Sequence, residues 1–138
     1  MELKGKIALV TGGGQGIGQV IGNHLAKTGA HVVFGDINLK NAEKSAEDVS
    51  ASGGKASAIL LNVTDPENVK VAFDSIKSKF KTLDILINNA GITKDGLFVR
   101  MKEDDWDSVL AVNLKGSFLC GQQAAKHMMK QRQGAIVN

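Results

Sequence analysis

Glycines occupy most positions between residues 12 and 18, directly after an apolar run that ends at Thr11. Ile17 then begins an apolar pattern with the period of a helix. Because glycine lacks a Cβ atom, the backbone of such a turn can approach a ligand closely. The first turn of a helix also leaves backbone N–H groups unpaired at its positive end. This arrangement suits a pyrophosphate, although a tight strand-to-helix turn without a ligand would give the same pattern.

An acidic residue, Asp36, ends the next apolar run, twenty residues after Gly16. A carboxylate at this point can accept a hydrogen bond from the 2′-hydroxyl of a dinucleotide ribose. A 2′-phosphate would be repelled by about 4 kcal/mol per unit charge at ~4 Å and an effective dielectric near ~20, before screening. Half of that repulsion disfavours NADP roughly thirtyfold. The residues therefore predict NAD(H) as the cofactor; the alternative is that Asp36 is a solvated turn residue.

Five short apolar runs alternate with segments of helical periodicity. The runs cover residues 6–11, 31–35, 56–61, 84–88 and 135–138. Most are continuously apolar, as expected for strands buried on both faces of a sheet. The helical segments cover residues 17–29, 39–50, 66–80 and 102–132. This alternation predicts one α/β domain over residues 1–138, a Rossmann-type doubly wound parallel sheet with helices on both faces.

Two of the helical segments indicate clearly which face is buried. The stripe of the first is Ile17, Val20, Ile21, Leu25 and Thr28. The stripe of the third is Val69, Phe73, Ile76 and Phe80, at near-ideal helical spacing. The start of the third is marked by Thr64 or Asp65 as the N-cap and by Pro66 in the first turn.

The composition is that of an ordinary globular protein. The chain has 138 residues, 43% hydrophobic and 22% charged, with a net charge of +3, which excludes disordered and collagen-like classes. No apolar run approaches the ~20 residues of a membrane span, and no signal-peptide core is present. The histidines share no metal-ligand spacing with one another or with the single cysteine, Cys120, so we expect no metal. The lone cysteine favours a reducing cytoplasm, and lysines spread among acids predict no nucleic-acid partner.

Further motifs resemble those of one family. Thr11-Gly12-x-x-x-Gly16-x-Gly18 is followed by Asn62-Val63, by Asn88-Asn89-Ala90-Gly91 and by Asn113, in that order. Together they resemble the short-chain dehydrogenase/reductase family over the whole length of the chain. Residues 6–18, 61–66, 83–93 and 100–106 resemble in particular its beta-ketoacyl-[acyl-carrier-protein] reductases.

The resemblance implies which residues contact the cofactor. They are Gly12, Gly14, Gln15, Gly16, Ile17, Gly18, Asp36, Ile37, Asn62, Val63, Asn89, Ala90 and Gly91. By this resemblance Asn62 and Val63 flank the adenine, while Asn89 and Gly91 lie closest to the cofactor in the loop that runs along its adenosine and nicotinamide ribose. Many of the similar reductases use NADPH and carry a basic residue at the position of Gln15, so an uncharged residue there adds to the prediction of NAD(H). A plain turn after a buried strand is the alternative for residues 88–91.

Asn113 is the catalytic residue that the resemblance implies within this chain. Trp106, Leu110, Ser117 and Gly121 lie on its side of the helix at three- and four-residue steps. We therefore expect Asn113 to face the sheet, where a buried amide needs hydrogen-bond partners. It could simply bridge backbone groups. In the family, however, the matching Asn holds a water in a proton relay behind the catalytic lysine, and we favour this role.

The resemblance also implies a catalytic serine and a Tyr-x-x-x-Lys pair. The chain contains no tyrosine, and it ends a few residues before the serine is expected. We therefore expect a truncated domain that lacks this catalytic half. The implied function is an NAD(H)-dependent oxidoreductase acting on a CH–OH group, a 3-oxoacyl-[acyl-carrier-protein] reductase of fatty acid synthesis. The alternatives are another short-chain alcohol, hydroxy acid or sugar dehydrogenase, or a non-catalytic NAD-binding module.

Two kinds of partner are implied besides the cofactor. Lys126, Lys130 and Arg132, at the end of the last helical segment, could dock an acidic carrier protein bearing the acyl substrate, or be ordinary helix-end cations. The same helical segment has more apolar surface than its packing against the sheet would bury. Family members commonly pair this helix across a dimer interface, so we expect an oligomer, a homotetramer. No membrane partner is expected.

Overall fold

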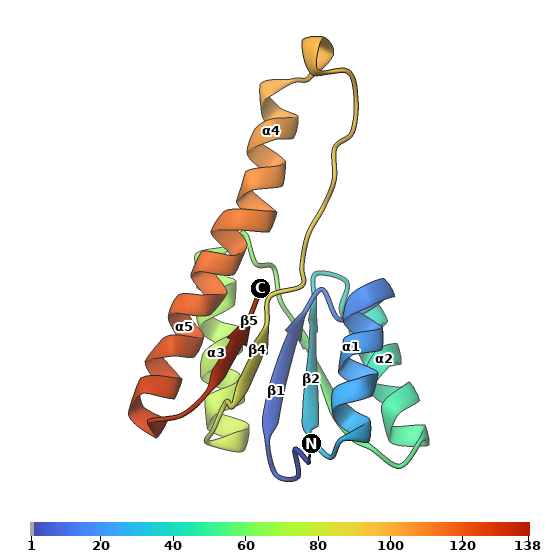
Figure 1. Cartoon of the computed structure of the whole chain (residues 1–138), viewed down its shortest axis with the longest axis vertical. Coiled ribbons are helices and arrows are strands. Elements are labelled where there is room, and N and C mark those ends of the chain that lie inside the picture. The colour runs from blue at the N-terminus through green and yellow to red at the C-terminus, as the bar shows by residue number, and fades with distance from the viewer. Residues whose placement is uncertain (1) are drawn as a thin grey trace.

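The computed structural model describes residues 2–138, which form a five-stranded parallel sheet with helices on both faces (Figure 1). The strands lie in the order β3-β2-β1-β4-β5. They are β1 (Ile7–Thr11), β2 (His31–Asp36), β3 (Lys55–Leu60), β4 (Ile85–Ile87) and β5 (Ala135–Val137). Each strand begins and ends within one residue of its predicted bounds, and the predicted fold class is confirmed.

The helices follow the strands as the periodicity predicts. They are α1 (Gly16–Lys27), α2 (Leu39–Ala51), α3 (Pro66–Phe80), α4 (Glu103–Leu110) and α5 (Gly116–Gln131), with a 3-10 turn η1 (Phe98–Arg100) and a π-helical turn η2 (Ala111–Lys115). Within residues 2–138, no helix combines the length and the apolar character that crossing a membrane requires.

Strand β1 shows why the apolar runs are continuous. Leu9 packs on one face of the sheet with Phe73 of α3 and Cys120 of α5. Its neighbours Ala8 and Val10 pack on the other face, in the cluster that includes residues of α1 and α2. All three strand residues are fully buried. Because successive side chains of a strand point to opposite faces, a sheet covered on both sides needs apolar residues at every position, each Val or Leu contributing ~1.5–3 kcal/mol.

The predicted stripe of α1 is right for Ile21 and Leu25, which pack against the core, and wrong for its first two members. Ile17 is 74% exposed and Val20 is 66% exposed, whereas Gly18 and Gly22 are buried. The ring of Phe34 lies directly against Gly22, where an added Cβ would collide with it. The helix approaches the strands through its small residues, which a search for large apolar side chains does not detect.

The predicted start of α3 is confirmed, with Asp65 rather than Thr64 as the N-cap. The Asp65 carboxylate accepts hydrogen bonds from two backbone N–H groups of the first turn, at 3.0 and 3.4 Å. Pro66 occupies the first helical position. The predicted stripe packs against the sheet, and its fully buried members are Val69, Phe73 and Ile76.

The long last helical segment consists of α4, η2 and α5 joined end to end (Figure 1). The predicted inward face is wrong, because Trp106 is 57% exposed and Leu110 is 37% exposed. The buried residues are Gly116, Cys120, Ala124 and Met128. A π-helical turn, η2, separates the two α-helical parts. α4 has no buried residue, because it rises beyond the edge of the sheet (Figure 1).

Candidate dinucleotide-binding site

A cleft of about 280 Å³ opens beyond the carboxyl ends of the strands. It lies where the strand order reverses, because β1 pairs with β2 on one side and with β4 on the other. Ligands of open α/β sheets bind at such a point. The cleft is lined by Gly12, Gln15, Asp36, Ile37, Leu61, Asn62, Val63, Thr64, Asn89, Ala90, Gly91, Ile92 and Val112.

The glycine turn between β1 and α1 presents unpaired backbone donors beside the cleft. Gln15 is the N-cap of α1 and makes no side-chain cap hydrogen bond. The backbone N–H groups of residues 16–18 donate to no acceptor within the described part of the chain. Free N–H groups and the positive end of a helix dipole together form an arrangement that binds phosphate.

The turn packs directly against the loop that follows β4. An added Cβ on Gly18 would collide with the carbonyl of Gly12 and the side-chain amide of Asn89. A side chain at this position would therefore push the two loops apart. The packing of the loops thus requires a glycine at residue 18, apart from any contact with a ligand.

The Asp36 carboxylate lies against the glycine turn with both oxygens hydrogen-bonded. Oδ2 accepts from the backbone nitrogen of Gly14 at 2.9 Å, and Oδ1 accepts from that of Asn38 at 2.9 Å. An added Cβ on Gly14 would lie 2.8 Å from Oδ2, so only glycine leaves room for this contact. The side chain is held at the wall of the cleft, and its remaining lone pairs can accept hydrogen bonds from hydroxyl groups.

Thr11 joins the end of β1 to the loop after β4. Its hydroxyl accepts hydrogen bonds from the backbone nitrogens of Asn89 and Ala90, at 3.0 and 2.9 Å, and donates to the carbonyl of Ile87 at 3.3 Å. In return, Asn89 Nδ2 donates to the carbonyls of Thr11 and Gly12, at 3.0 and 3.1 Å. The side-chain nitrogen of Asn89 thus joins the two loops. Thr11 begins the predicted glycine motif, but the sequence did not indicate that its hydroxyl makes these bonds.

The loop after β3 supplies another wall of the cleft. Asn62 Oδ1 accepts from the backbone nitrogen and the hydroxyl of Thr64, at 3.1 and 2.7 Å. The backbone nitrogen of Asn62 donates to Asn68 Oδ1 at 2.6 Å. Val63 is 7% exposed and packs into the core beneath the loop. These contacts hold Asn62 at the cleft.

Asn113 does not face the sheet as predicted. It lies on the π-helical turn η2 and is exposed. Its Oδ1 accepts from the backbone nitrogen of Ile92 at 2.8 Å, and its Nδ2 donates to the Ile92 carbonyl at 3.0 Å. These two bonds match the alternative in which the amide bridges backbone groups. They tie the long helix to the segment that follows Gly91, at the rim of the cleft.

Comparison with known proteins accounts for this combination of fold and cleft. A family model described as short chain dehydrogenase matches residues 6–138. The chain belongs to the short-chain dehydrogenase family. A 3-oxoacyl-[acyl-carrier-protein] reductase of Thermotoga maritima is 44% identical over 138 residues, which are 100% of this chain and 56% of the relative. The reductase of the same name from Salmonella typhimurium is 41% identical over 137 residues, 99% of this chain and 55% of the relative.

Solved structures support the same assignment. The crystal structure of gox2181 has a TM-score of 0.96 and 33% identity, covering 98% of this chain and 53% of that one. A short-chain type dehydrogenase/reductase from Mycobacterium marinum has a TM-score of 0.94 and 32% identity, covering 98% of this chain and 54% of that one. The chain spans about half the length of the curated relatives it matches.

In this member of the family, most predicted cofactor residues surround the cleft. Those that line it are Gly12, Gln15, Asp36, Ile37, Asn62, Val63, Asn89, Ala90 and Gly91. Gly14, Gly16, Ile17 and Gly18 lie in the adjoining turn and in the first turn of α1. The prediction missed Leu61, Thr64, Ile92 and Val112. The first three adjoin predicted residues in the sequence, whereas Val112 comes to the cleft only through the placement of η2.

The chain has one thiol, Cys120, and it does not line the cleft. Cys120 is fully buried in α5, and burial raises the pKa of its thiol to about 12. A thiol in this state is neither a nucleophile nor a metal ligand at neutral pH. No group of three or more His, Cys, Asp or Glu side chains suited to a metal ion occurs between residues 2 and 138.

Proposed function

We propose that this chain is the dinucleotide-binding part of an NADH-dependent reductase that converts a 3-oxoacyl thioester on a carrier protein to the 3-hydroxyacyl thioester. The observation that carries the proposal is the cleft itself. Its wall holds a doubly anchored carboxylate, Asp36, and unpaired N–H groups of α1 lie beside it. The names of the curated relatives support the substrate class.

The residues around the cleft fit an adenine dinucleotide. The free N–H groups of residues 16–18 would bind its pyrophosphate, and Asp36 would accept a hydroxyl of the adenosine ribose. Asn62 and Val63 would border the adenine. Residues 89–91 would border the rest of the cofactor, with the backbone of Gly91 open to it. Ile37 is 67% exposed, so it offers the base an apolar contact.

The anchoring of Asp36 supports NADH over NADPH. Its carboxylate cannot turn away from a 2′-phosphate without losing the bonds from Gly14 and Asn38. Gln15, also in the cleft wall, carries no charge to compensate the repulsion between the two anions. A dinucleotide with a free 2′-hydroxyl would instead gain a charge-assisted hydrogen bond.

The bound cofactor would supply the hydride, and a positioned acid must supply the proton to the ketone oxygen. The 138 residues contain no tyrosine, so in this proposal the serine and the Tyr-x-x-x-Lys pair belong to the rest of the reductase. Asn113 would support the proton relay that lies behind the catalytic lysine. By holding Ile92 at both its nitrogen and its carbonyl, it would keep η2 in place to hold the water of the proton relay.

The outer face of the long helix supports one two-fold interface of the proposed homotetramer. Trp106, Leu110, Leu114 and Phe118 follow one another at four-residue steps, with exposed fractions of 57%, 37%, 67% and 60%. Acidic residues 103–105 lie at one end of the helix and Lys130 at the other. Two copies paired antiparallel would bury the stripe and bring opposite charges together. The unpaired thiol supports a cytoplasmic setting.

A calorimetric titration of the chain with NADH and with NADPH tests the cofactor half of the proposal. We expect NADH to bind at least about tenfold more tightly. The absence of heat with either cofactor at millimolar concentration would contradict the dinucleotide site. NADH oxidation by the whole protein with acetoacetyl thioester tests the substrate, since another dehydrogenase of the family would leave this substrate unchanged. Binding without turnover of any ketone would instead indicate a non-catalytic NAD-binding module.

A further inference from the structure

A second hollow opens at the amino ends of the strands, the lower end of the sheet in Figure 1, opposite the dinucleotide cleft. Its volume is about 700 Å³, against about 280 Å³ for the cleft. It lies between the turn before β1, the end of α1, the start of β2 and the loop between α2 and β3. We define this basal hollow by Lys4, Ile7, Ala26, Lys27, His31 and Lys55.

The floor of the basal hollow is apolar. Ile7, Ala26 and Ala30 line it and are 8%, 9% and 1% exposed. Ala26 also lines an adjoining hollow of about 420 Å³ between α1 and α2, where Val49 continues the apolar surface. Concave spaces of about 300–1,000 Å³ with an apolar lining and a few polar groups are typical of small-molecule sites.

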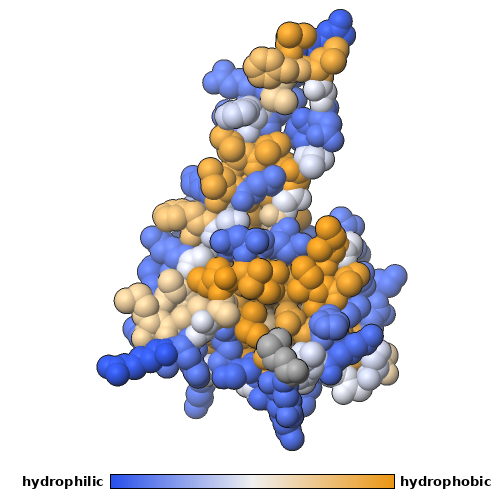
Figure 2. All heavy atoms as spheres, in the orientation of Figure 1, coloured by the Kyte–Doolittle hydropathy of each residue, from blue (hydrophilic) through white to orange (hydrophobic). Residues whose placement is uncertain are grey.

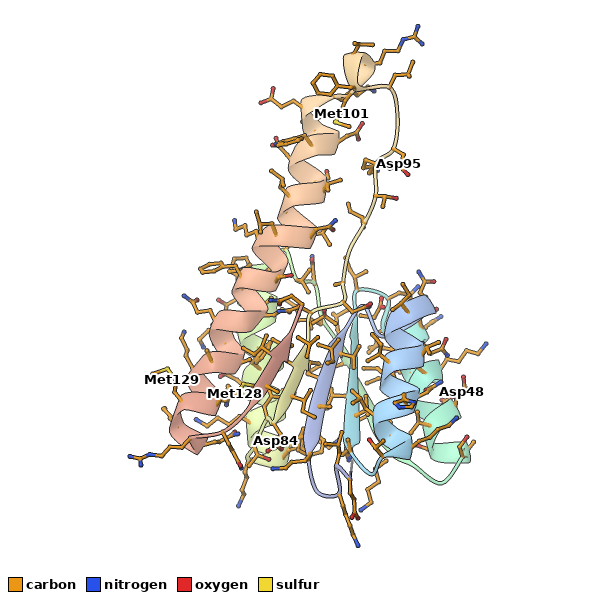
Figure 3. The ribbon with its side chains drawn as sticks, viewed as in Figure 1. Asp48, Asp84, Asp95, Met101, Met128 and Met129 are labelled. Atoms are coloured by element: carbon orange, nitrogen blue, oxygen red, sulfur yellow. The ribbon has the colours of Figure 1, made fainter. Side chains whose placement is uncertain are left out.

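The rim carries three lysines without a carboxylate partner. Lys4, Lys27 and Lys55 are exposed, and none of them forms a salt bridge within residues 2–138. The nearby Lys6 is instead paired at 3.3 Å with Asp84, which Figure 3 shows at the amino end of β4. Figure 2 shows hydrophilic side chains projecting around this lower end of the molecule. The rim therefore presents positive charge that the protein itself does not neutralise.

The turn before β1 brings backbone donors to the same rim. The Lys6 nitrogen donates to the Leu3 carbonyl at 3.0 Å, and Gly5 has the positive φ, 79°, that a type II turn requires at its third residue. The Leu3 nitrogen donates to the Thr28 carbonyl at 2.7 Å, which ties the turn to the end of α1. The N–H groups of Lys4 and Gly5 donate to no acceptor in the described part of the chain. Free N–H groups of successive residues can hold an anion.

His31 forms a wall of the basal hollow whose position is fixed by two contacts. Its ring centroid lies 4.5 Å from that of Phe80, and its Nε2 lies 3.2 Å from Ser57 Oγ. Burial lowers the pKa of His31, and the charges of Lys79 and Lys55 lower it further. An anion beside Lys55 would oppose these charges and make protonation of the ring easier. The imidazole of His31 can therefore report on the occupancy of the hollow.

We propose that the basal hollow binds a small organic anion, a carboxylate or a phosphate that carries an apolar stem. Its head would lie among the lysines and the free N–H groups of the turn, where charge-assisted hydrogen bonds form. Its stem would cover the apolar floor. Among the described lining residues, Glu2 alone carries a carboxylate, so the excess positive charge disfavours a cationic ligand. Because the hollow and the cleft lie at opposite ends of the strands, both can be occupied at once.

The test is a titration of the isotope-labelled protein followed by NMR, with hexanoate and hexyl phosphate as probes. The titration is done with and without saturating NADH, because hexyl phosphate could also occupy the glycine turn at the start of α1. We expect the backbone amide signals of Lys4, Gly5 and Gly53 to shift and saturate in both cases, and the pKa of His31 to rise. The tighter of the two probes identifies the head group as carboxylate or phosphate, and hexylammonium should not bind.

Paired variants test the rim. Lys27→Gln with Lys55→Gln removes two of the three unpaired charges and should weaken the tighter probe about tenfold or more. The control Lys40→Gln with Lys44→Gln removes the same charge at exposed positions of α2 that do not line the hollow. It should weaken the probe less than about twofold. NADH affinity should be unchanged in both double variants, because the four lysines lie outside the cleft.

Other results would overturn the proposal. Shifts confined to residues 12–18 would place the anion in the glycine turn, and equal weakening by the two double variants would show a general charge effect. Inorganic phosphate that binds as tightly as hexyl phosphate would show that the apolar floor takes no part. Loss of NADH binding while the probe still shifts Lys4 and Gly5 would contradict the dinucleotide site and leave the basal hollow supported, so the two sites fail separately.

Discussion

Thr11 and Asn89 hold each other by a reciprocal pair of hydrogen bonds. The Thr11 hydroxyl accepts from the Asn89 backbone nitrogen at 3.0 Å, and the Asn89 side-chain nitrogen donates to the Thr11 carbonyl at 3.0 Å. This pair fixes the spacing between the glycine turn and the loop after β4, the two walls between which a dinucleotide would lie.

Replacing Thr11 by Val should therefore affect both stability and binding. The variant leaves the backbone N–H groups of Asn89 and Ala90 without their acceptor, which costs about 1–3 kcal/mol for each group that stays buried. Urea unfolding and NADH calorimetry measure the two effects. Thr11→Ser retains the hydroxyl and should behave almost like the wild type. Because Thr11→Val retains the γ-methyl group and removes only the hydroxyl, wild-type stability and NADH affinity in Thr11→Val would contradict the role of the hydroxyl.

Replacing Asp36 by Ala should abolish the preference for NADH. The variant removes both the acceptor for the ribose hydroxyl and the charge that repels a 2′-phosphate, so NADH affinity should fall about tenfold while NADPH affinity rises. Titration calorimetry with each cofactor measures the change. Asp48→Ala, at an exposed position of α2, is the matched control. An unchanged preference for NADH in Asp36→Ala would refute the role of this carboxylate.

A methyl group at Gly18 should open the cleft. Its Cβ would collide with the Gly12 carbonyl and the Asn89 amide, so Gly18→Ala should cost about 1–3 kcal/mol of stability and weaken NADH binding strongly. Gly96→Ala is the control, since a Cβ at that position meets no atom within 4 Å. Equal melting temperatures and affinities for the two variants would contradict the close packing of the loops.

Lys81→Gly should raise the free energy of unfolding. Glycine adopts the φ of 66° that Lys81 has as the C-cap of α3 without strain, and the gain should be about 1 kcal/mol after the entropy of the unfolded chain is considered. Lys79→Gly removes a lysine two residues earlier inside α3 and should destabilise by about 1 kcal/mol. Denaturant unfolding distinguishes the two. Destabilisation by both variants would mean that Lys81 is not strained.

The Cys120 thiol should be unreactive until the protein unfolds. Its pKa in the folded chain is about 12 against an ordinary 9.0, so the folded state retains a proton that the unfolded state loses between these pH values. Stability should fall as pH rises from 9.0 toward 12, less so in Cys120→Ala, and the thiol should contribute no pH dependence below that window. Labelling with a thiol reagent at pH 8 should follow global unfolding; fast labelling of the native protein would contradict this burial.

The alternation of strands and helices could be predicted because it depends on local pattern. The continuous apolar runs at Ile7–Thr11 and His31–Asp36 identify covered strands, and the glycine turn and Asp36 identify the cleft between them. The faces of α1 and of the long helix could not be predicted in the same way. Close approach through Gly22 depends on the position of the Phe34 ring, and α4 is exposed because it lies beyond the sheet that α5 packs against.

The order and spacing of residue types along the chain were enough to predict the parallel sheet, the family and most of the residues that line the cleft. The hydrogen-bond partners of Thr11, Asn89 and Asn113 became known only from the folded chain. Those relationships join residues far apart in the chain, and hydrogen bonds and close packing depend on distances in space that no local periodicity specifies.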